Sequence, residues 1–174
     1  MPRKTRKNRT RHRRLRKTRA TVRIMKGGQR SLVVRYGDVM VRDGQKLTKE
    51  STQQAPVVQF TPVQGAYYTL IMWDPDVPGA IQPGFLHWLA TNLTTPRDIA
   101  LHSVVPYYGP HPPSGTHRYF FGLFKQTDRI SGGDTYPREK FSIQDVINKH
   151  HLTLVETVFM RVPSSQYKNP MHRY

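Results

Sequence analysis

The chain has 174 residues, 36% of them hydrophobic, so it can form one folded domain around a single core. It contains no cysteine, which excludes disulfides, thiolate metal sites and a cysteine nucleophile. Its net charge is +17. No apolar run approaches the roughly 20 residues that span a bilayer, so we expect a soluble protein that is not secreted.

Residues 1–30 form a basic arm. They hold 14 of the 28 lysines and arginines and none of the 11 acidic residues, whereas the other 144 residues carry a net charge of only +3. Apolar side chains are too few here to offset the entropy of ordering, so we expect the arm to be disordered in isolation. Residues 31–174 are predicted to form the folded domain, with Gly27 and Gly28 as a hinge.

A dense run of like charge binds polyanions by releasing their counterions. We therefore expect the arm to bind nucleic acid or a nucleoprotein particle with little sequence preference. The alternatives are a nuclear or nucleolar address, an anchor in a virion or ribosome-like particle, a contact with an anionic membrane, and a solubilising tail. The residues expected to contact nucleic acid are Arg3, Lys4, Arg6, Lys7, Arg9, Arg11, Arg13, Arg14, Arg16, Lys17 and Arg19.

Short apolar runs separated by turn residues follow the arm. They are rich in Val, Tyr, Phe, Thr and Trp, which is typical of strands, and several are apolar on both faces. We therefore predict a mainly β, sandwich-like domain. The runs span residues 31–41, 56–63, 67–73, 85–93, 117–126 and 152–162.

One helix is indicated near residues 142–150. Ser142 can cap it, with Asp145 in the capping-box position, and Phe141 can pack against Val146. The paired histidines that follow suit the negative end of the helix dipole, so a structural role explains them better than metal binding.

Three polar side chains stand at strand ends in the middle of the chain. Asp74 ends one predicted strand, His87 follows the start of the next, and His117 opens a third. Because antiparallel neighbours place the end of one strand beside the start of the next, these side chains can meet at one edge of the sheet. Tyr119 lies two residues after His117 and shares its face, while Arg118 points to the other face.

The loop before His117, "YYGPHPPSGT", contains three prolines and two glycines, which stiffen it and let main-chain amides approach a small ligand. Together with the carboxylate, two imidazoles and a phenol, it makes a polar site suited to a small oxyanion. The alternatives are satisfied polar groups at strand ends, or a metal site of Asp74, His87 and His117. Asp76 can instead neutralise Arg118, and no serine lies in a GxSxG turn.

The blocks "YYTLIMWDPDVP", "LHWLATNL" and "GPHPPSGTHRYFFGLFKQ" resemble the signature blocks of the phosphatidylethanolamine-binding protein (PEBP) family. That family includes Raf-kinase-inhibitor-like proteins and plant flowering regulators. The resemblance covers roughly residues 31–163 and leaves out the arm. The stretch "GAIQPG" after Pro78 departs from the family pattern.

The resemblance implies a central antiparallel sheet, one or two short helices and a small anion pocket at one end. It also implies phosphate-like groups or phospholipid headgroups as ligands, protein partners and no catalysis, with no cofactor. The residues of this sequence that match the family's pocket are Asp74, His87, Gly109, Pro112, Pro113, His117 and Tyr119.

Three functions remain open at this point, and an enzyme is the weakest reading because no activated nucleophile is evident. The first is a non-catalytic anion-binding module whose arm binds nucleic acid or a particle. The second is a structural component of a large assembly with a vestigial pocket, and the third is a signalling regulator of a kinase or transcription factor. The arm favours the nucleus, the nucleolus or a virion or ribosome-like particle as the location.

The two histidines predict a pH dependence for the site. An imidazole near a bound anion gains stability when charged, so we expect tighter anion binding as the pH falls from about 7.5 to about 6 through contributions of His87 and His117.

Overall fold

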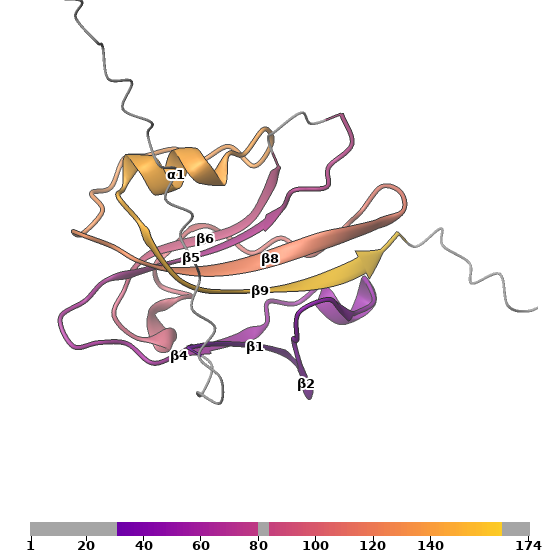
Figure 1. Cartoon of the computed structure of the whole chain (residues 1–174), viewed down its shortest axis with the longest axis horizontal. Coiled ribbons are helices and arrows are strands. Elements are labelled where there is room, and N and C mark those ends of the chain that lie inside the picture. The colour runs from indigo at the N-terminus through magenta and orange to yellow at the C-terminus, as the bar shows by residue number, and fades with distance from the viewer. Residues whose placement is uncertain (1–30, 80–83, 165–174) are drawn as a thin grey trace, which may run out of the picture.

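The computed structural model describes residues 31–79 and 84–164, which form two packed β-sheets and a short α-helix (Figure 1). The basic arm and its expected hinge lie outside the described residues. The strands are β1 (Leu32–Tyr36), β2 (Val39–Met40), β3 (Gln45–Lys46), β4 (Val57–Phe60), β5 (Tyr68–Asp74), β6 (Phe85–Leu93), β7 (Ser103–Val105), β8 (Thr116–Lys125) and β9 (Thr153–Pro163). The helices are α1 (Ile143–Lys149) and the 3-10 helices η1 (Glu50–Thr52) and η2 (Pro96–Asp98).

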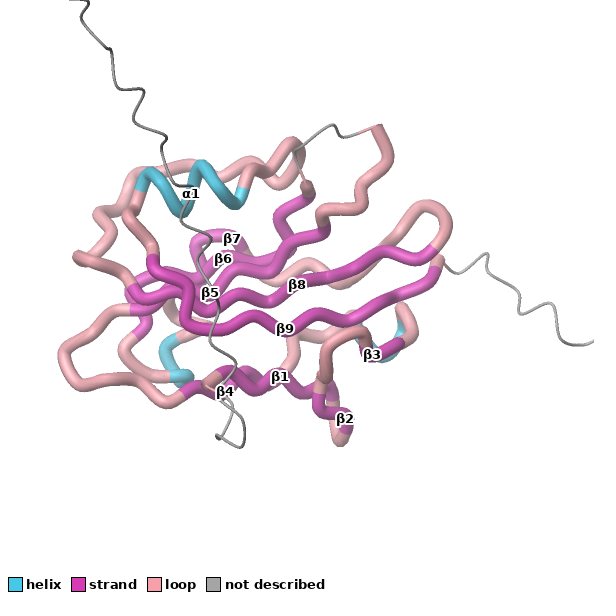
Figure 2. The backbone as a smooth tube through the Cα atoms, in the orientation of Figure 1, coloured by secondary structure: helices cyan, strands magenta, loops and turns pink. Residues whose placement is uncertain are grey.

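The larger sheet has six strands in the order β3-β9-β8-β5-β6-β7, and the smaller has three in the order β2-β1-β4 (Figure 2). Every pair is antiparallel except β3 with β9 at one edge, which is parallel. The predicted mainly β fold is therefore confirmed, and the large sheet is mixed because of this two-residue edge strand.

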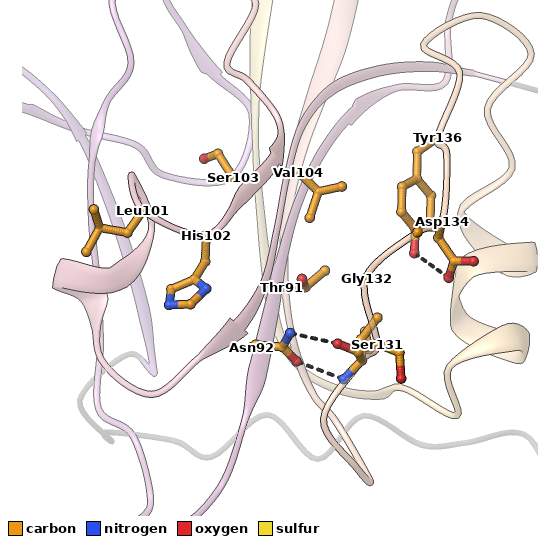
Figure 3. Close-up of a pocket in the computed structure, with 12 residues that line it drawn as sticks. Thr91, Asn92, Leu101, His102, Ser103, Val104, Ser131, Gly132, Asp134 and Tyr136 are labelled. Carbon is orange, nitrogen blue, oxygen red and sulfur yellow. Dashed lines mark hydrogen bonds between the residues drawn. The ribbon is translucent and has the colours of Figure 1, made fainter.

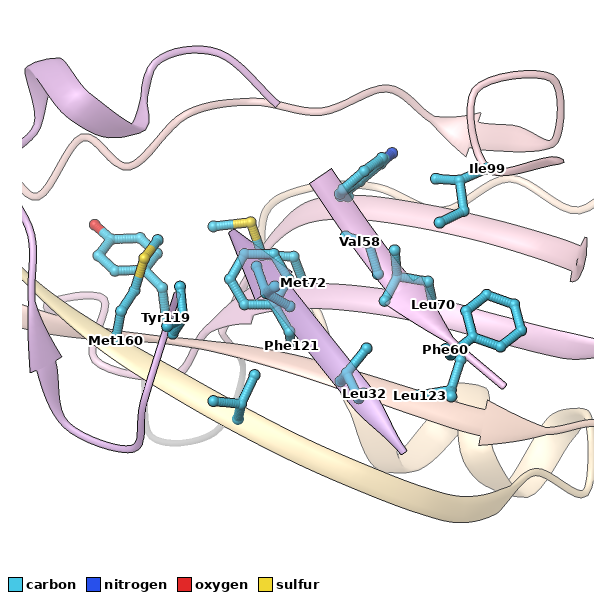
Figure 4. Close-up of a cluster of buried hydrophobic side chains, with 14 of the residues drawn as sticks. Leu32, Val58, Phe60, Leu70, Met72, Ile99, Tyr119, Phe121, Leu123 and Met160 are labelled. Atoms are coloured by element: carbon cyan, nitrogen blue, oxygen red, sulfur yellow. The ribbon is translucent and has the colours of Figure 1, made fainter. Parts of the chain in front are cut away.

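The main core lies between the two sheets. Alternate side chains of the central strands enter it, such as Leu70 and Met72 of β5 and Phe121 and Leu123 of β8, and they pack in one cluster with Leu32 of β1 (Figure 4). Fully burying such a side chain contributes about 1.5–3 kcal/mol, so this layer supplies most of the apolar stabilisation.

The other face of the large sheet has a second, smaller core under α1. Ile71 of β5 and Phe124 of β8 point to this side, where they join Phe141 and Val146. The central strands therefore bury both faces, which explains why their sequences are apolar without alternation.

The helix begins as the sequence predicts. The Ser142 side chain accepts a hydrogen bond from the main-chain N–H of Asp145 at 3.2 Å, and Val146 is buried on the apolar face. No helix in the described part of the chain is both long and apolar enough to cross a bilayer.

The order of the central strands positions the polar residues. β5 pairs with β6 on one side and β8 on the other, with Asp74 opposite Phe85 and Trp73 opposite Phe120. The end of β5 therefore lies beside the starts of both β6 and β8.

Candidate anion-binding site

The structure brings four of the predicted site residues together at this edge of the sheet. Asp74, His87, His117 and Tyr119 come from β5, β6 and β8, and all are buried, with Tyr119 at 0% exposure. A carboxylate, two imidazoles and a phenol thus share one small volume that is nearly closed to water. We call these four residues the polar cluster.

Asp74 is bonded to His117 and to its own turn. His117 Nδ1 donates to Asp74 Oδ2 at 2.7 Å, and the main-chain N–H of Asp76 donates to Asp74 Oδ1 at the same distance. Burial raises the pKa of the Asp74 carboxyl, although both hydrogen bonds oppose this shift. Of the two imidazoles in the polar cluster, it is His117 that is hydrogen-bonded to Asp74.

His87 is oriented by the main chain. Its Nδ1 donates to the carbonyl oxygen of Tyr108 at 2.7 Å, and its ring meets that of Tyr119 edge-on at 5.1 Å between centroids. Burial lowers the pKa of His87 to about 4, and the nearby charges of Arg138 and His117 act in the same direction.

His87 is neutral in the free protein. With a pKa of about 4, His87 stays uncharged between pH 6 and pH 7.5 in the free protein. Because a carbonyl can only accept, Nδ1 carries the proton and Nε2 is left as an acceptor. His87 therefore gains a charge in that interval only if a bound anion raises its pKa.

The hydroxyl of Tyr119 is buried and has no hydrogen-bond partner among the described residues. Burial, followed by the negative charge of Asp74, raises the pKa of Tyr119. The main chain at His111 opposes this shift and a polar contact with the Asp74 side chain adds to it, but neither contact has the geometry of a hydrogen bond. A buried donor without a partner costs about 1–3 kcal/mol and is rare in native structures. The Tyr119 hydroxyl is therefore left available for a further hydrogen bond.

The predicted site residues in the proline-rich loop differ in their burial and packing. Pro112 is buried and Pro113 is exposed. Gly109 packs against η1, because an added Cβ would lie 3.0 Å from Gln53 Cα and from the Thr52 carbonyl oxygen. Close packing explains this glycine without a ligand.

Sequence reasoning missed two residues that build the site. Tyr108 supplies the carbonyl that fixes His87, and Arg138 donates to the carbonyls of Leu86 and His87 at 3.0 Å and of Pro106 at 2.6 Å. Arg138 thereby ties the start of β6 to the proline-rich loop. No sequence signal indicates these contacts, since main-chain acceptors are present at every residue.

The sequence profile of the family described as "Phosphatidylethanolamine-binding protein" matches residues 38–160. The chain belongs to this family. Protein MOTHER of FT and TFL1 homolog 2 of Oryza sativa subsp. japonica is 32% identical over 135 residues, which cover 74% of this chain and 78% of that protein. Protein FLOWERING LOCUS T of Arabidopsis thaliana is 33% identical over 138 residues, which cover 74% and 77%.

Solved structures agree on the PEBP fold. A carboxypeptidase Y inhibitor complexed with its cognate proteinase superposes with a TM-score of 0.66 at 22% identity, covering 77% of this chain and 83% of that one. A phosphatidylethanolamine-binding protein from Plasmodium falciparum superposes with a TM-score of 0.61 at 20% identity, covering 75% and 83%. At this level of identity the likeness concerns the fold alone.

Within this PEBP domain, Asp76 neutralises Arg118, which is the structural role that the sequence left open. Arg118 Nε and Nη2 donate to its two carboxylate oxygens at 2.8 and 2.6 Å, which lowers the pKa of Asp76. The metal alternative has no support, because no group of three or more His, Asp or Glu among the described residues is placed to hold an ion.

A pocket of about 260 Å³ lies near the end of β6, at Thr91 and Asn92 (Figure 3). It is formed between β6, β7 and the loop around residues 130–136, where the Asn92 amide is bonded to the main chain of Ile130 in both directions. None of the predicted site residues lines it.

Proposed function

We propose that this chain is a non-catalytic regulator of the PEBP family that acts through protein partners and holds a small oxyanion in the polar cluster. The regulatory part is supported by relatives whose names refer to flowering, including Protein FLOWERING LOCUS T and Protein TERMINAL FLOWER 1, at 33% and 34% identity. The oxyanion part depends on one observation, the unpaired hydroxyl of Tyr119.

The chemistry of the cluster favours an oxyanion. Tyr119 offers an O–H donor. His87 and His117 each bind an oxygen of the protein through Nδ1, and among the described residues neither Nε2 has a hydrogen-bond partner, so both can face a ligand. A neutral imidazole presents an acceptor at Nε2, whereas a charged one presents a donor. Binding of an anion is therefore expected to bring proton uptake by the imidazoles. A phosphate-like group has the oxygens to satisfy all three positions.

The same contacts argue against catalysis. A serine or threonine nucleophile needs a base within hydrogen-bond distance. In the part of the chain that the structure describes, neither imidazole is hydrogen-bonded to a hydroxyl, and each Nδ1 is already bonded. The arrangement supports binding.

Calorimetric titration tests the ligand. Inorganic phosphate and phosphoethanolamine are titrated into the full chain and into the His117→Gln variant. We expect both compounds to bind the wild type, with weaker binding to the variant, and tighter binding of phosphoethanolamine would identify a lipid headgroup. No binding of either compound to the wild type contradicts the oxyanion site.

Affinity capture with the full chain tests the regulatory role. We expect a defined protein to co-purify in a stoichiometric amount. Recovery of nucleic acid alone would instead favour a tether or an assembly component.

A further inference from the structure

The large sheet has an outer face that α1 covers only in part. The helix lies over the β5 and β6 side, and the start of β8 and the end of β9 extend beyond it (Figure 1). Outward-pointing side chains in this region are partly or fully exposed, including Arg118 and Arg161. This region lies on the opposite face of the sheet from Tyr119 and the main core.

Three basic side chains form a row across this face. Lys46 of β3 pairs in register with Arg161 of β9, and Arg161 pairs with Arg118 of β8, so three neighbouring strands each present one cation. Like charges directly opposite on neighbouring strands destabilise a sheet. Asp76 neutralises Arg118, but neither Lys46 nor Arg161 is ion-paired with a carboxylate of the described residues. The positive charges of Lys46 and Arg161 therefore repel each other, and a bound anionic partner would reduce this repulsion.

An aromatic row runs beside the cationic one. Trp73, Phe120 and Phe159 are cross-strand neighbours, and their rings stack at 5.2 and 5.1 Å between centroids. The guanidinium groups of Arg118 and Arg161 lie 5.8 and 6.0 Å from the centroids of Phe120 and Phe159. Aromatic and arginine side chains of this kind are enriched at the centres of protein interfaces.

The stacking of these aromatic rings favours a protein partner over a single-stranded nucleic acid. Single-stranded nucleic acid binds aromatic platforms through bases that stack on free ring faces. Here the faces of Phe120 and Phe159 are directed at neighbouring rings and guanidinium groups, so mainly ring edges are left for a partner. Guanidinium groups held in place over aromatic rings instead suit the paired oxygens of carboxylates.

We propose that the rows on β3, β9, β8 and β5 are a docking surface for an acidic, carboxylate-rich segment of a partner protein. This inference rests on the proposed regulatory function, because it supplies the surface through which a protein partner is bound. Acidic side chains of the segment pair with Lys46 and Arg161, and its apolar side chains pack against the edges of Phe120 and Phe159.

The test compares two charge reversals in the full chain. A fluorescein-labelled peptide of alternating Glu and Leu is titrated into Arg161→Glu and into Lys125→Glu, an exposed cation at the far end of β8. The basic arm is intact in both, so its attraction for the peptide cancels. We expect Arg161→Glu to weaken binding at least about tenfold more than Lys125→Glu does.

Thermal melting checks that the variants are folded. If Arg161→Glu does not fold, Arg161→Gln replaces it, and since it removes a like-charge pair we expect its melting temperature to equal or exceed that of the wild type. Equal loss of peptide binding in the Arg161 and Lys125 variants overturns the proposal.

Two further experiments test the docking surface and the proposed regulatory function separately. Weaker binding of a single-stranded RNA oligonucleotide to Arg161→Glu, with peptide binding unchanged, would replace the acidic protein segment by nucleic acid. If a protein captured by the wild type binds Arg161→Glu equally well, the surface assignment fails while the regulatory role stands. If the peptide result holds but no protein is captured, the regulatory role fails instead.

Discussion

At the scale of single residues, the polar cluster contains groups that are held by hydrogen bonds and one hydroxyl that has none among the described residues. Asp74 accepts two hydrogen bonds and His87 is fixed by a carbonyl, whereas the Tyr119 hydroxyl has no partner in the described chain. A fold selected for stability alone gains nothing from this hydroxyl, because phenylalanine fills the same space. This hydroxyl is therefore the observation on which the proposed oxyanion site rests.

Tyr119→Phe removes this buried donor and is expected to stabilise the free protein by about 1 kcal/mol, since the desolvation cost disappears while the ring packing stays. Urea unfolding monitored by circular dichroism measures the change in the free energy of unfolding. Tyr136→Phe is the matched control, because the Tyr136 hydroxyl is bonded to Asp134 and to His150, so its removal should destabilise. A less stable Tyr119→Phe protein would mean that the hydroxyl is satisfied in the free state.

The lowered pKa of His87 predicts a pH-dependent stability. Its pKa falls from 6.5 to about 4 on folding, so the unfolded chain binds more protons between these values. The contribution of His87 is complete above about pH 6.5 and is lost as the pH falls to about 4, by on the order of 3 kcal/mol. Unfolding free energies of the wild type and His87→Gln should diverge by this amount. Parallel pH profiles would show that His87 is not buried neutral.

At the scale of elements, the sequence predicts the parts whose signal is local. The cap at Ser142 lies where the capping pattern places it, and the meeting of Asp74 with His117 follows from the ends of adjacent antiparallel strands. The parallel strand β3 could not be predicted, because two residues carry no periodicity and their pairing with β9 is made across more than a hundred positions. The tie between Arg138 and the main chain of β6 is equally non-local.

The start of β6 is held close to the end of β5 by Gly84. An added Cβ at this position would overlap the carbonyl oxygen of Asp74, so Gly84→Ala must push the two strands apart. We expect a loss of about 2 kcal/mol in the free energy of unfolding and weaker oxyanion binding. Gly132→Ala, where the added Cβ meets open space, is the control and should have little effect. Equal stability of both variants would contradict this account of the β5–β6 junction.

At the scale of the whole molecule, the charge of the chain is divided between an arm and a domain. The arm holds 14 basic residues and no acidic ones, and its binding to nucleic acid stays a prediction from composition. Deletion of residues 1–28 should abolish RNA or DNA binding and leave the stability of the domain unchanged. Filter binding to the full chain should weaken strongly between about 50 and about 200 mM salt, and affinity that does not change with salt would contradict an electrostatic arm.

The central claim is that this PEBP domain holds an oxyanion between the hydroxyl of Tyr119 and the imidazoles of His87 and His117. The most direct test is calorimetric titration of sulfate, which stays fully ionised, into the wild type and Tyr119→Phe at about pH 6. We predict one site per wild-type chain, with proton uptake that makes the heat depend on the buffer, and at least about tenfold weaker binding to the variant. Equal affinities of the two proteins, or no buffer dependence, would contradict the account.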